Sequence, residues 1–292
     1  MLIGICSAIG ASLAWSYSCF IWRINSFIIS PIRINLLKNI IAIGVFSPSL
    51  LTINLFQDIK YILILITSGI IGIGLGDTFY IKSLKLIGTR KTLSIEALGP
   101  LIAALSGVFF LKENLSLTSW IGIAIVSVSL FKILLKDKII LINNPDNTIS
   151  TSNFKSLIYP ILSIICAVIA ALLSRKVFLE TNLNPFETTE IRLFGAIIFL
   201  LIATKFEINL SLANIKRKDK LTLLFSIILG TNIGILLQQI VFKTLPLGIG
   251  WTLLSTSPIF SLIFTEKEEG KLSFETIITT IILCCGIGLT II

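Results

Sequence analysis

Four ionisable side chains stand out in this chain because each lies within a long stretch of apolar residues. Two are carboxylates, Asp77 and Glu96, and two are cations, Lys38 and Arg192. An ionisable group inside the hydrocarbon layer of a membrane is costly, and the groups that persist there commonly bind or relay something. These four residues are therefore the first candidates for binding and proton chemistry.

Asp77 and Glu96 lie at similar distances from the turn that joins their two apolar stretches. Each is about seven residues from that turn, which places both roughly 10 Å into the membrane at 1.5 Å per helical residue. If antiparallel helices bring the two carboxylates together, their repulsion favours a proton on one of them. This pair predicts proton coupling. The alternative is a set of structural ion pairs with Lys82, Lys85 or Arg90.

Lys38 and Arg192 occupy related places, because each follows a proline, Pro31 or Pro185, at the same spacing. Two cations facing a central cavity would suit an anionic group such as a carboxylate or a phosphate. The alternative is that these long side chains reach the membrane interface and anchor at the lipid headgroups.

Uncharged polar and aromatic residues add a second set of candidates. The double amide Gln238 and Gln239 needs partners in an apolar stretch, and only one of the two is expected to face a cavity. Tyr80 and Trp15 are further candidates for the cavity wall, although packing between helices explains them as well. Trp251 is expected in the aromatic belt at the membrane interface.

Two stretches of the chain carry the same small and helix-breaking residues at a constant spacing. The ungapped pairs are Gly72 with Gly230, Gly76 with Gly234, Lys85 with Lys243, and Pro100 with Pro258. Glycines spaced by four allow helices to approach closely, and prolines interrupt helices and free backbone polar groups. The recurrence indicates an internal duplication, with glycines at packing surfaces and prolines at hinges.

The composition shows which elements must hold these residues. The chain has 292 residues, of which 55% are hydrophobic and 13% charged, whereas soluble domains carry about a quarter charged residues. We therefore expect an all-α integral membrane protein whose helices each cross the bilayer. Ten spans are expected, at 1–22, 31–53, 61–84, 89–111, 117–135, 154–179, 185–206, 220–243, 248–265 and 272–292.

The spans divide into two halves of five. The first half covers residues 1–135, the second covers residues 154–292, and residues 136–153 form a polar loop between them. A half with an odd number of spans ends on the side opposite to its start, so its duplicate enters the membrane upside down. The count therefore predicts two inverted-topology repeats.

The formal net charge of +9 fits loops that face anionic lipid headgroups better than it fits a nucleic-acid partner. Most Lys and Arg residues fall in loops on the side opposite the N-terminus, which favours both termini outside the cell. The chain contains no histidine, and its cysteines lack metal-ligand spacing, so neither a metal nor another cofactor is expected.

Several motifs in order resemble the drug/metabolite transporter superfamily, in its ten-helix EamA-type branch. The motifs are Tyr80-Ile-Lys-Ser-Leu-Lys, Gly99-Pro100, Leu111-Lys-Glu-Asn-Leu-Ser, Trp120-Ile-Gly122, and the prolines followed by Lys38 and Arg192. The resemblance covers essentially the whole chain. It implies a carrier with a substrate cavity between two halves, in a bacterial plasma membrane. It also implies both termini in the cytoplasm, contrary to the charge bias.

The expected function is secondary transport of a small polar metabolite, an amino acid or a related compound, with export as the expected direction. Protons are the expected coupling ion, and the protein is expected to be a monomer or a homodimer. The alternative is a sugar-phosphate or nucleotide-sugar carrier, which the basic residues favour and the lack of a basic pair in the last two spans disfavours. A membrane enzyme is a remote alternative, because clustered acids or histidines would be expected.

Overall fold

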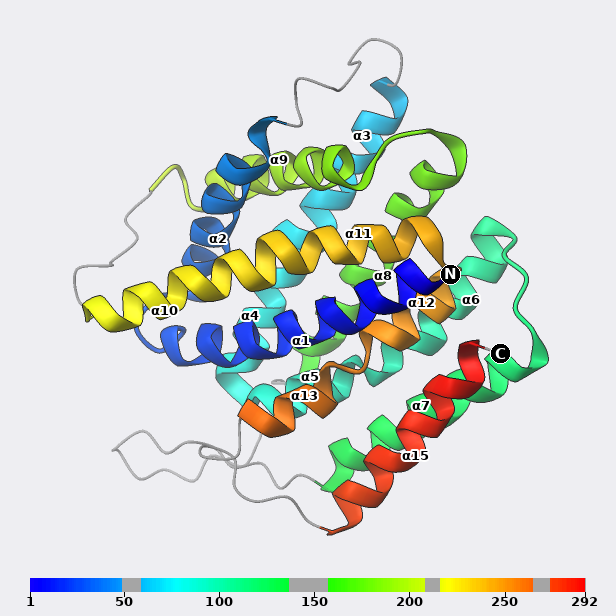
Figure 1. Ribbon diagram of the computed structural model, residues 1–292. Helices are drawn as coiled ribbons and strands as arrows, with labels where there is room; N and C mark the ends of the chain where they lie inside the picture. Colours follow the sequence, from blue (N-terminus) through cyan, green and yellow to red (C-terminus); the bar gives the residue numbers. More distant parts are fainter. Residues whose placement is uncertain (49–58, 137–156, 208–215, 265–273, 292) are drawn as a thin grey trace.

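The computed structural model describes residues 1–48, 59–136, 157–207, 216–264 and 274–291, and the elements within these ranges are helices (Figure 1). The expected loop at 136–153 lies, apart from its first residue, outside the described residues. The first half contains α1 (Leu2–Asn25), α2 (Pro31–Phe46), α3 (Ile59–Ser68), η2 (Gly69–Gly76), α4 (Asp77–Ile87), α5 (Thr89–Ile95), η3 (Glu96–Leu98), α6 (Gly99–Leu111) and α7 (Leu117–Lys136). The second half contains α8 (Ile158–Glu180), α9 (Pro185–Ala203), α10 (Arg217–Ile227), η6 (Ile228–Ile233), α11 (Gly234–Thr244), α12 (Leu247–Leu254), α13 (Ser257–Phe264) and α15 (Phe274–Ile291).

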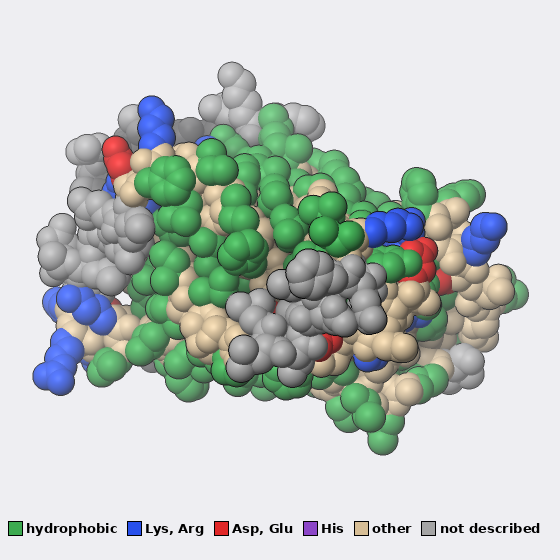
Figure 2. Space-filling model, turned by 90° about the horizontal axis from the view of Figure 1, so that it is seen from above, with side chains coloured by type: hydrophobic (Ala, Val, Ile, Leu, Met, Phe, Trp, Pro, Cys, Tyr) green, Lys and Arg blue, Asp and Glu red, His purple; other side chains and the backbone are tan. Residues whose placement is uncertain are grey.

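Helices occur in all ten of the ranges expected to span the membrane. Within the described ranges, the helices long and apolar enough to cross a bilayer by themselves are Leu2–Asn25, Ile59–Ile87, Ile158–Glu180 and Arg217–Thr244. Hydrophobic side chains cover the middle of the face in Figure 2, whereas Lys and Arg gather toward its two ends. This distribution is typical of a protein whose middle contacts lipid and whose ends contact water.

Two helices widen into π-helical segments at equivalent places in the two halves. These are η2 in the run Ile59–Ile87 and η6 in the run Arg217–Thr244. In each case the first helix of the other half packs on the widened segment, α8 on η2 and α1 on η6. The approach is close, because a Cβ added to Gly72 would lie 2.5 Å from the Cβ of Ala170. Only glycine fits at such a crossing.

Two other helices are interrupted at equivalent places. The first interruption is the 3-10 turn η3, and the second is the turn at Ser255 and Thr256 between α12 and α13. Pro100 and Pro258 follow these interruptions, and a proline cannot donate the hydrogen bond to the carbonyl four residues before it. The freed carbonyl of Leu254 instead accepts the Ser12 hydroxyl at 2.8 Å.

Equivalent helices of the two halves run in opposite directions. The start of α2 lies beside the end of α9, where Arg33 and Glu207 form an ion pair at 3.7 Å. The end of α2 lies beside the start of α9, where the rings of Phe46 and Phe186 are 6.2 Å apart. The last helices of the halves, α7 and α15, also pack side by side (Figure 1). The repeats are therefore inverted, as the odd number of spans predicted.

Candidate functional site

A cavity lies where the two halves meet, and both contribute to its wall. Helix α1, η2 with α4, and η3 contribute from the first half; α8, α9, α11, α12 and α13 contribute from the second. The centres of water-sized molecules can occupy about 90 Å³ of it, whereas one water needs about 10–15 Å³. The cavity therefore has room for several waters or a small polar molecule.

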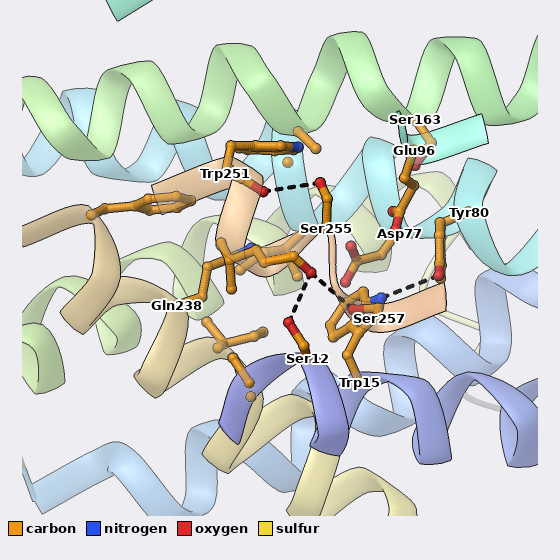
Figure 3. Close-up of a pocket in the computed structure, with 18 of the residues that line it drawn as sticks. Ser12, Trp15, Asp77, Tyr80, Glu96, Ser163, Gln238, Trp251, Ser255 and Ser257 are labelled. Carbon is orange, nitrogen blue, oxygen red and sulfur yellow. Dashed lines mark hydrogen bonds between the residues drawn. The ribbon is translucent and has the colours of Figure 1, made fainter. Parts of the chain in front are cut away.

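The two intramembrane carboxylates meet at one end of this cavity. Asp77 begins α4 and Glu96 begins η3, and both line the wall. Figure 3 shows their side chains next to each other, with Tyr80 at the same end, and the two carboxylates repel each other electrostatically. The described residues supply neither a hydrogen bond nor an ion pair to Glu96. Glu96 is thus free to exchange a proton or to bind a cationic group.

Lys38 does not face the cavity, contrary to the expectation for a substrate-binding residue. Its side chain is fully buried, and its ammonium donates to the carboxylate of Asp77. The ammonium also lies 4.9 Å from the ring centroid of Trp22 and 5.7 Å from that of Trp15. Neither alternative proposed for Lys38, a cavity cation or a headgroup anchor, matches this position. The Lys38–Asp77 pair instead cancels two charges beside the cavity.

Arg192 does line the cavity, and it is the cation left available there. Its guanidinium extends along η2, with Nη2 at 3.4 Å from the place where a Cβ on Gly72 would stand. Nε and Nη1 are buried and have no hydrogen-bond partner among the described residues. Unpaired buried donors are costly, so an anionic ligand that accepts from them would be bound favourably.

Aromatic rings form much of the remaining wall. Trp15 donates from Nε1 to the Tyr80 hydroxyl at 3.2 Å, and this hydroxyl also contacts the Cys19 thiol at 3.2 Å. Trp251 is 9% exposed, lines the cavity and stacks on Phe242 with ring centroids 6.1 Å apart. The interface position expected for Trp251 is therefore wrong. Its indole nitrogen occupies the space beside Gly99, where an added Cβ would lie 2.1 Å away.

The double amide divides as helix geometry predicts, because Gln238 lines the cavity and Gln239 does not. Gln239 is fully buried, and both of its side-chain polar atoms lack a partner among the described residues. Four serines that the sequence analysis did not single out also line the cavity: Ser12, Ser163, Ser255 and Ser257. Serine is common in membrane helices, so its type alone gives little signal.

The expected packing glycines and hinge prolines occupy crossings and interruptions. Gly72 and Gly230 sit at tight crossings, with an added Cβ on Gly230 only 2.4 Å from the Ser18 side chain. A Cβ added to Gly76 would lie 3.2 Å from the Cβ of Cys166, which is a tight contact. A Cβ added to Gly234 would have no neighbour nearer than 3.6 Å, and Gly234 lines the cavity. Gly234 therefore leaves space for a ligand more than it permits helix packing.

The sequence analysis also gave no role to Glu113, Arg175 and Glu190, whose side chains have little exposed surface. Glu113 and Arg175 form an ion pair at 2.8 Å. Glu190 on α9 is fully buried, and neither carboxylate oxygen has a hydrogen-bond partner among the described residues. Glu113 and Arg175 lie at helix ends, where charged residues are usual and attract no notice. Glu190 was considered only as a neighbour of Arg192, two positions away.

Comparisons with known proteins agree with this architecture. A solved structure described as a crystal structure of a protein matches with a TM-score of 0.70 and 15% identity, over 96% of this chain and 94% of that one. No curated protein matches. The model of the EamA-like transporter family matches residues 2–135 and again residues 154–292. The chain therefore belongs to the EamA-like transporter family and is a multi-pass membrane transporter of a small molecule.

Proposed function

We propose that the chain is a proton-coupled secondary transporter of an amino acid or a related small polar compound, with export as the direction. The observation that carries this proposal is that a carboxylate, Glu96, and a guanidinium, Arg192, line one cavity, and that neither forms an ion pair with the residues that the structure describes. A compound with both an acidic and a basic group has a complementary partner for each.

Alternating access is the proposed mechanism, because the cavity lies between two inverted halves that can move against each other. In this proposal residues 1–135 and 154–292 are the two moving bodies, and 136–153 connects them. Gly72, Gly76, Gly230 and Gly234, with Pro100 and Pro258, allow the motion. Trp15, Tyr80 and Gln238 line the cavity through which the substrate passes. Lys38 and Gln239 are buried outside the cavity, and Lys38 positions the carboxylate of Asp77.

Asp77 and Glu96 are the proposed proton site. Lys38 forms an ion pair with Asp77, and Asp77 and Glu96 lie side by side on the cavity wall (Figure 3), where a proton bound between two carboxylates relieves their repulsion. Glu96 therefore carries the proton, and Asp77 positions it. A proton gradient across a bacterial plasma membrane would supply the driving force, whether the protein is a monomer or a homodimer.

The test is uptake into proteoliposomes of pooled labelled amino acids and, separately, of pooled sugar phosphates, with and without a proton gradient. Saturable, gradient-dependent transport of amino acids supports the proposal. Transport of sugar phosphates alone favours the alternative carrier, whose dianionic substrate would rely on Arg192. That alternative ranks second, because Lys38 is already neutralised and the cavity wall also carries two acids. Protein that is folded and transports neither pool contradicts both.

A further inference from the structure

The cavity ends, on the side of the N-terminus, at a cluster of buried polar contacts between the two halves. Glu113 follows α6 in the first half, and Arg175 lies near the end of α8 in the second. Nε of Arg175 donates to Oε1 of Glu113 at 2.8 Å, and the two side chains are only 11% and 8% exposed. Such a pair is well shielded from water.

Both partners also hold the backbone of the second half. Nη1 of Arg175 donates to the carbonyls of Phe242 and Lys243, each at 2.9 Å, at the end of α11. The other oxygen of Glu113 accepts from the backbone N–H of Leu247 at 2.7 Å, at the start of α12. The two side chains thereby satisfy helix-end groups that would otherwise lack partners.

This cluster adjoins the cavity directly. Phe242, whose carbonyl Arg175 holds, lines the cavity and stacks on Trp251. The N-terminus of α1 covers the same end, because a Cβ on Gly4 would lie 2.4 Å from the Thr244 hydroxyl. In Figure 1 the N-terminus lies beside the end of α11, α12 and α6.

We propose that Glu113 and Arg175 are the gate of the transporter on the N-terminal side, closed when paired and opened by their separation. The inference rests on the proposed alternating access, since contacts that join the halves at one end must break when that end opens. A buried ion pair suits this role because its attraction is largely offset by the cost of removing both charges from water. The open and closed states then differ little in free energy.

A second ion pair between the halves provides a matched control. Arg33 and Glu207 pair at 3.7 Å on the opposite side of the membrane, with side chains 31% and 70% exposed. An exposed pair at that distance contributes little. Glu207→Gln therefore removes the same charge from an inter-half contact without disturbing a closed gate.

The experiment measures the distance between spin labels on Asn114, in the first half, and Asn182, in the second, by pulsed EPR on the full chain with its five native cysteines replaced. Both positions are exposed. We expect Glu113→Gln and Arg175→Gln each to shift the distance distribution toward longer values. The double variant should shift it no further, and Glu207→Gln should leave it unchanged.

Identical distributions in the wild type and all variants, with thermal unfolding showing folded protein, would overturn the gate. If Arg175→Gln fails to fold, Glu113→Gln decides the matter, because it removes the same ion pair from the other side; an unshifted distribution there also overturns the gate. The readout needs no substrate. A distance shift without amino-acid transport would thus contradict the proposed substrate alone, and normal transport without a shift would contradict the gate alone.

Discussion

The four charged residues that the sequence analysis singled out have two different roles. Lys38 and Asp77 neutralise each other, and Lys38 is fully buried. Glu96 and Arg192 form no ion pair with the described residues, and both line the cavity. Because an uncompensated charge in a membrane is costly, these two side chains gain most from a bound proton or ligand.

Glu96→Gln should abolish transport driven by a proton gradient but preserve exchange of substrate at equal pH. The amide cannot carry a proton, yet it matches the carboxyl in shape and keeps the cavity polar. The measurement compares gradient-driven uptake with counterflow in the same proteoliposomes. Glu180→Gln, on an exposed acid at the end of α8, is the matched control. Loss of both activities, or of neither, would argue against proton coupling by Glu96.

Arg192→Gln should raise the KM for an anionic or zwitterionic substrate about 10–100-fold, because a hydrogen bond to a charged group contributes about 1.5–3 kcal/mol. Initial rates of uptake over a range of concentrations measure the effect. Lys176→Gln removes one positive charge from the partly exposed surface of α8 and should leave the KM unchanged. An unaltered KM in folded Arg192→Gln protein would mean that Arg192 does not contact the substrate.

Intramembrane acids can be found in a sequence because they contrast with their apolar surroundings, and Asp77 and Glu96 indeed lie in one cavity. Their partners are harder to predict. The Lys38–Asp77 pair joins α2 to α4, and which helices adjoin is decided by tertiary packing. Glu113 and Arg175 are charged residues near helix ends, where charged residues are common in membrane proteins. Only the folded structure shows that they form an ion pair.

At the scale of elements, the interrupted helices place backbone groups beside the cavity. The carbonyl of Leu254 accepts hydrogen bonds from Ser12 at 2.8 Å and from Ser257 at 3.0 Å, since Pro258 has no N–H to offer it. The two serine hydroxyls thus replace the backbone hydrogen bond that Pro258 cannot make. Rotation about the Cβ–Oγ bond breaks such a hydrogen bond without moving the backbone.

Pro258→Ala should restore that helical bond and join α12 to α13. We expect a higher thermal unfolding temperature in detergent, because an interior proline costs a helix about 3 kcal/mol, and a slower transport rate, because the hinge is lost. Pro31→Ala is the control, since Pro31 begins α2, where its missing N–H has no helical partner anyway. Unchanged stability together with unchanged transport would show that the interruption has another cause.

Gly72→Ala should destabilise the protein by about 1–3 kcal/mol, as overpacking of a close contact does. The new methyl group would stand 2.5 Å from the Cβ of Ala170 and would also crowd Arg192. Gly44→Ala should be neutral or slightly stabilising, because no atom lies within 4 Å of its added Cβ. Thermal unfolding in detergent compares the two. If both variants unfold at the same temperature, η2 and α8 can move apart to fit the new methyl group without loss of stability.

The helix interruptions follow from the sequence because proline has a single, local effect on backbone bonding, as at Pro100 and Pro258. The π-helical segments do not. Gly72 and Gly230 indicate close packing, but whether a helix widens there depends on the helix that crosses it. The inward turn of Trp251 likewise depends on Gly99, since a Cβ there would lie 2.1 Å from its indole nitrogen.

For the whole molecule, the inverted arrangement suits the proposed alternating access, in which closing one end of the cavity opens the other. The two halves contact each other along antiparallel helices, α2 with α9 and α7 with α15. Under the proposed alternating access, one rocking motion of this interface would expose the same residues to opposite sides of the membrane. The odd span count of each half predicted this inversion, although it said nothing of where the halves touch.

The cancellation of Lys38 by Asp77 has an electrical consequence. With Glu96 ionised, the empty site is neutral, because Glu96 and Arg192 offset each other. A proton bound with a zwitterion makes the moving site singly positive, whereas a proton bound with a monoanion leaves it neutral.

Membrane voltage should therefore act on the first kind of cargo and not on the second, by about 2.3 kcal/mol per 100 mV for a charge that crosses the full potential. Currents recorded from proteoliposomes on a solid support would show this. A transient current on addition of a zwitterion, and silence with a monoanion, are expected; equal currents for both would contradict this charge balance. The voltage of the cell, and not only its acidity, would then select what the protein carries.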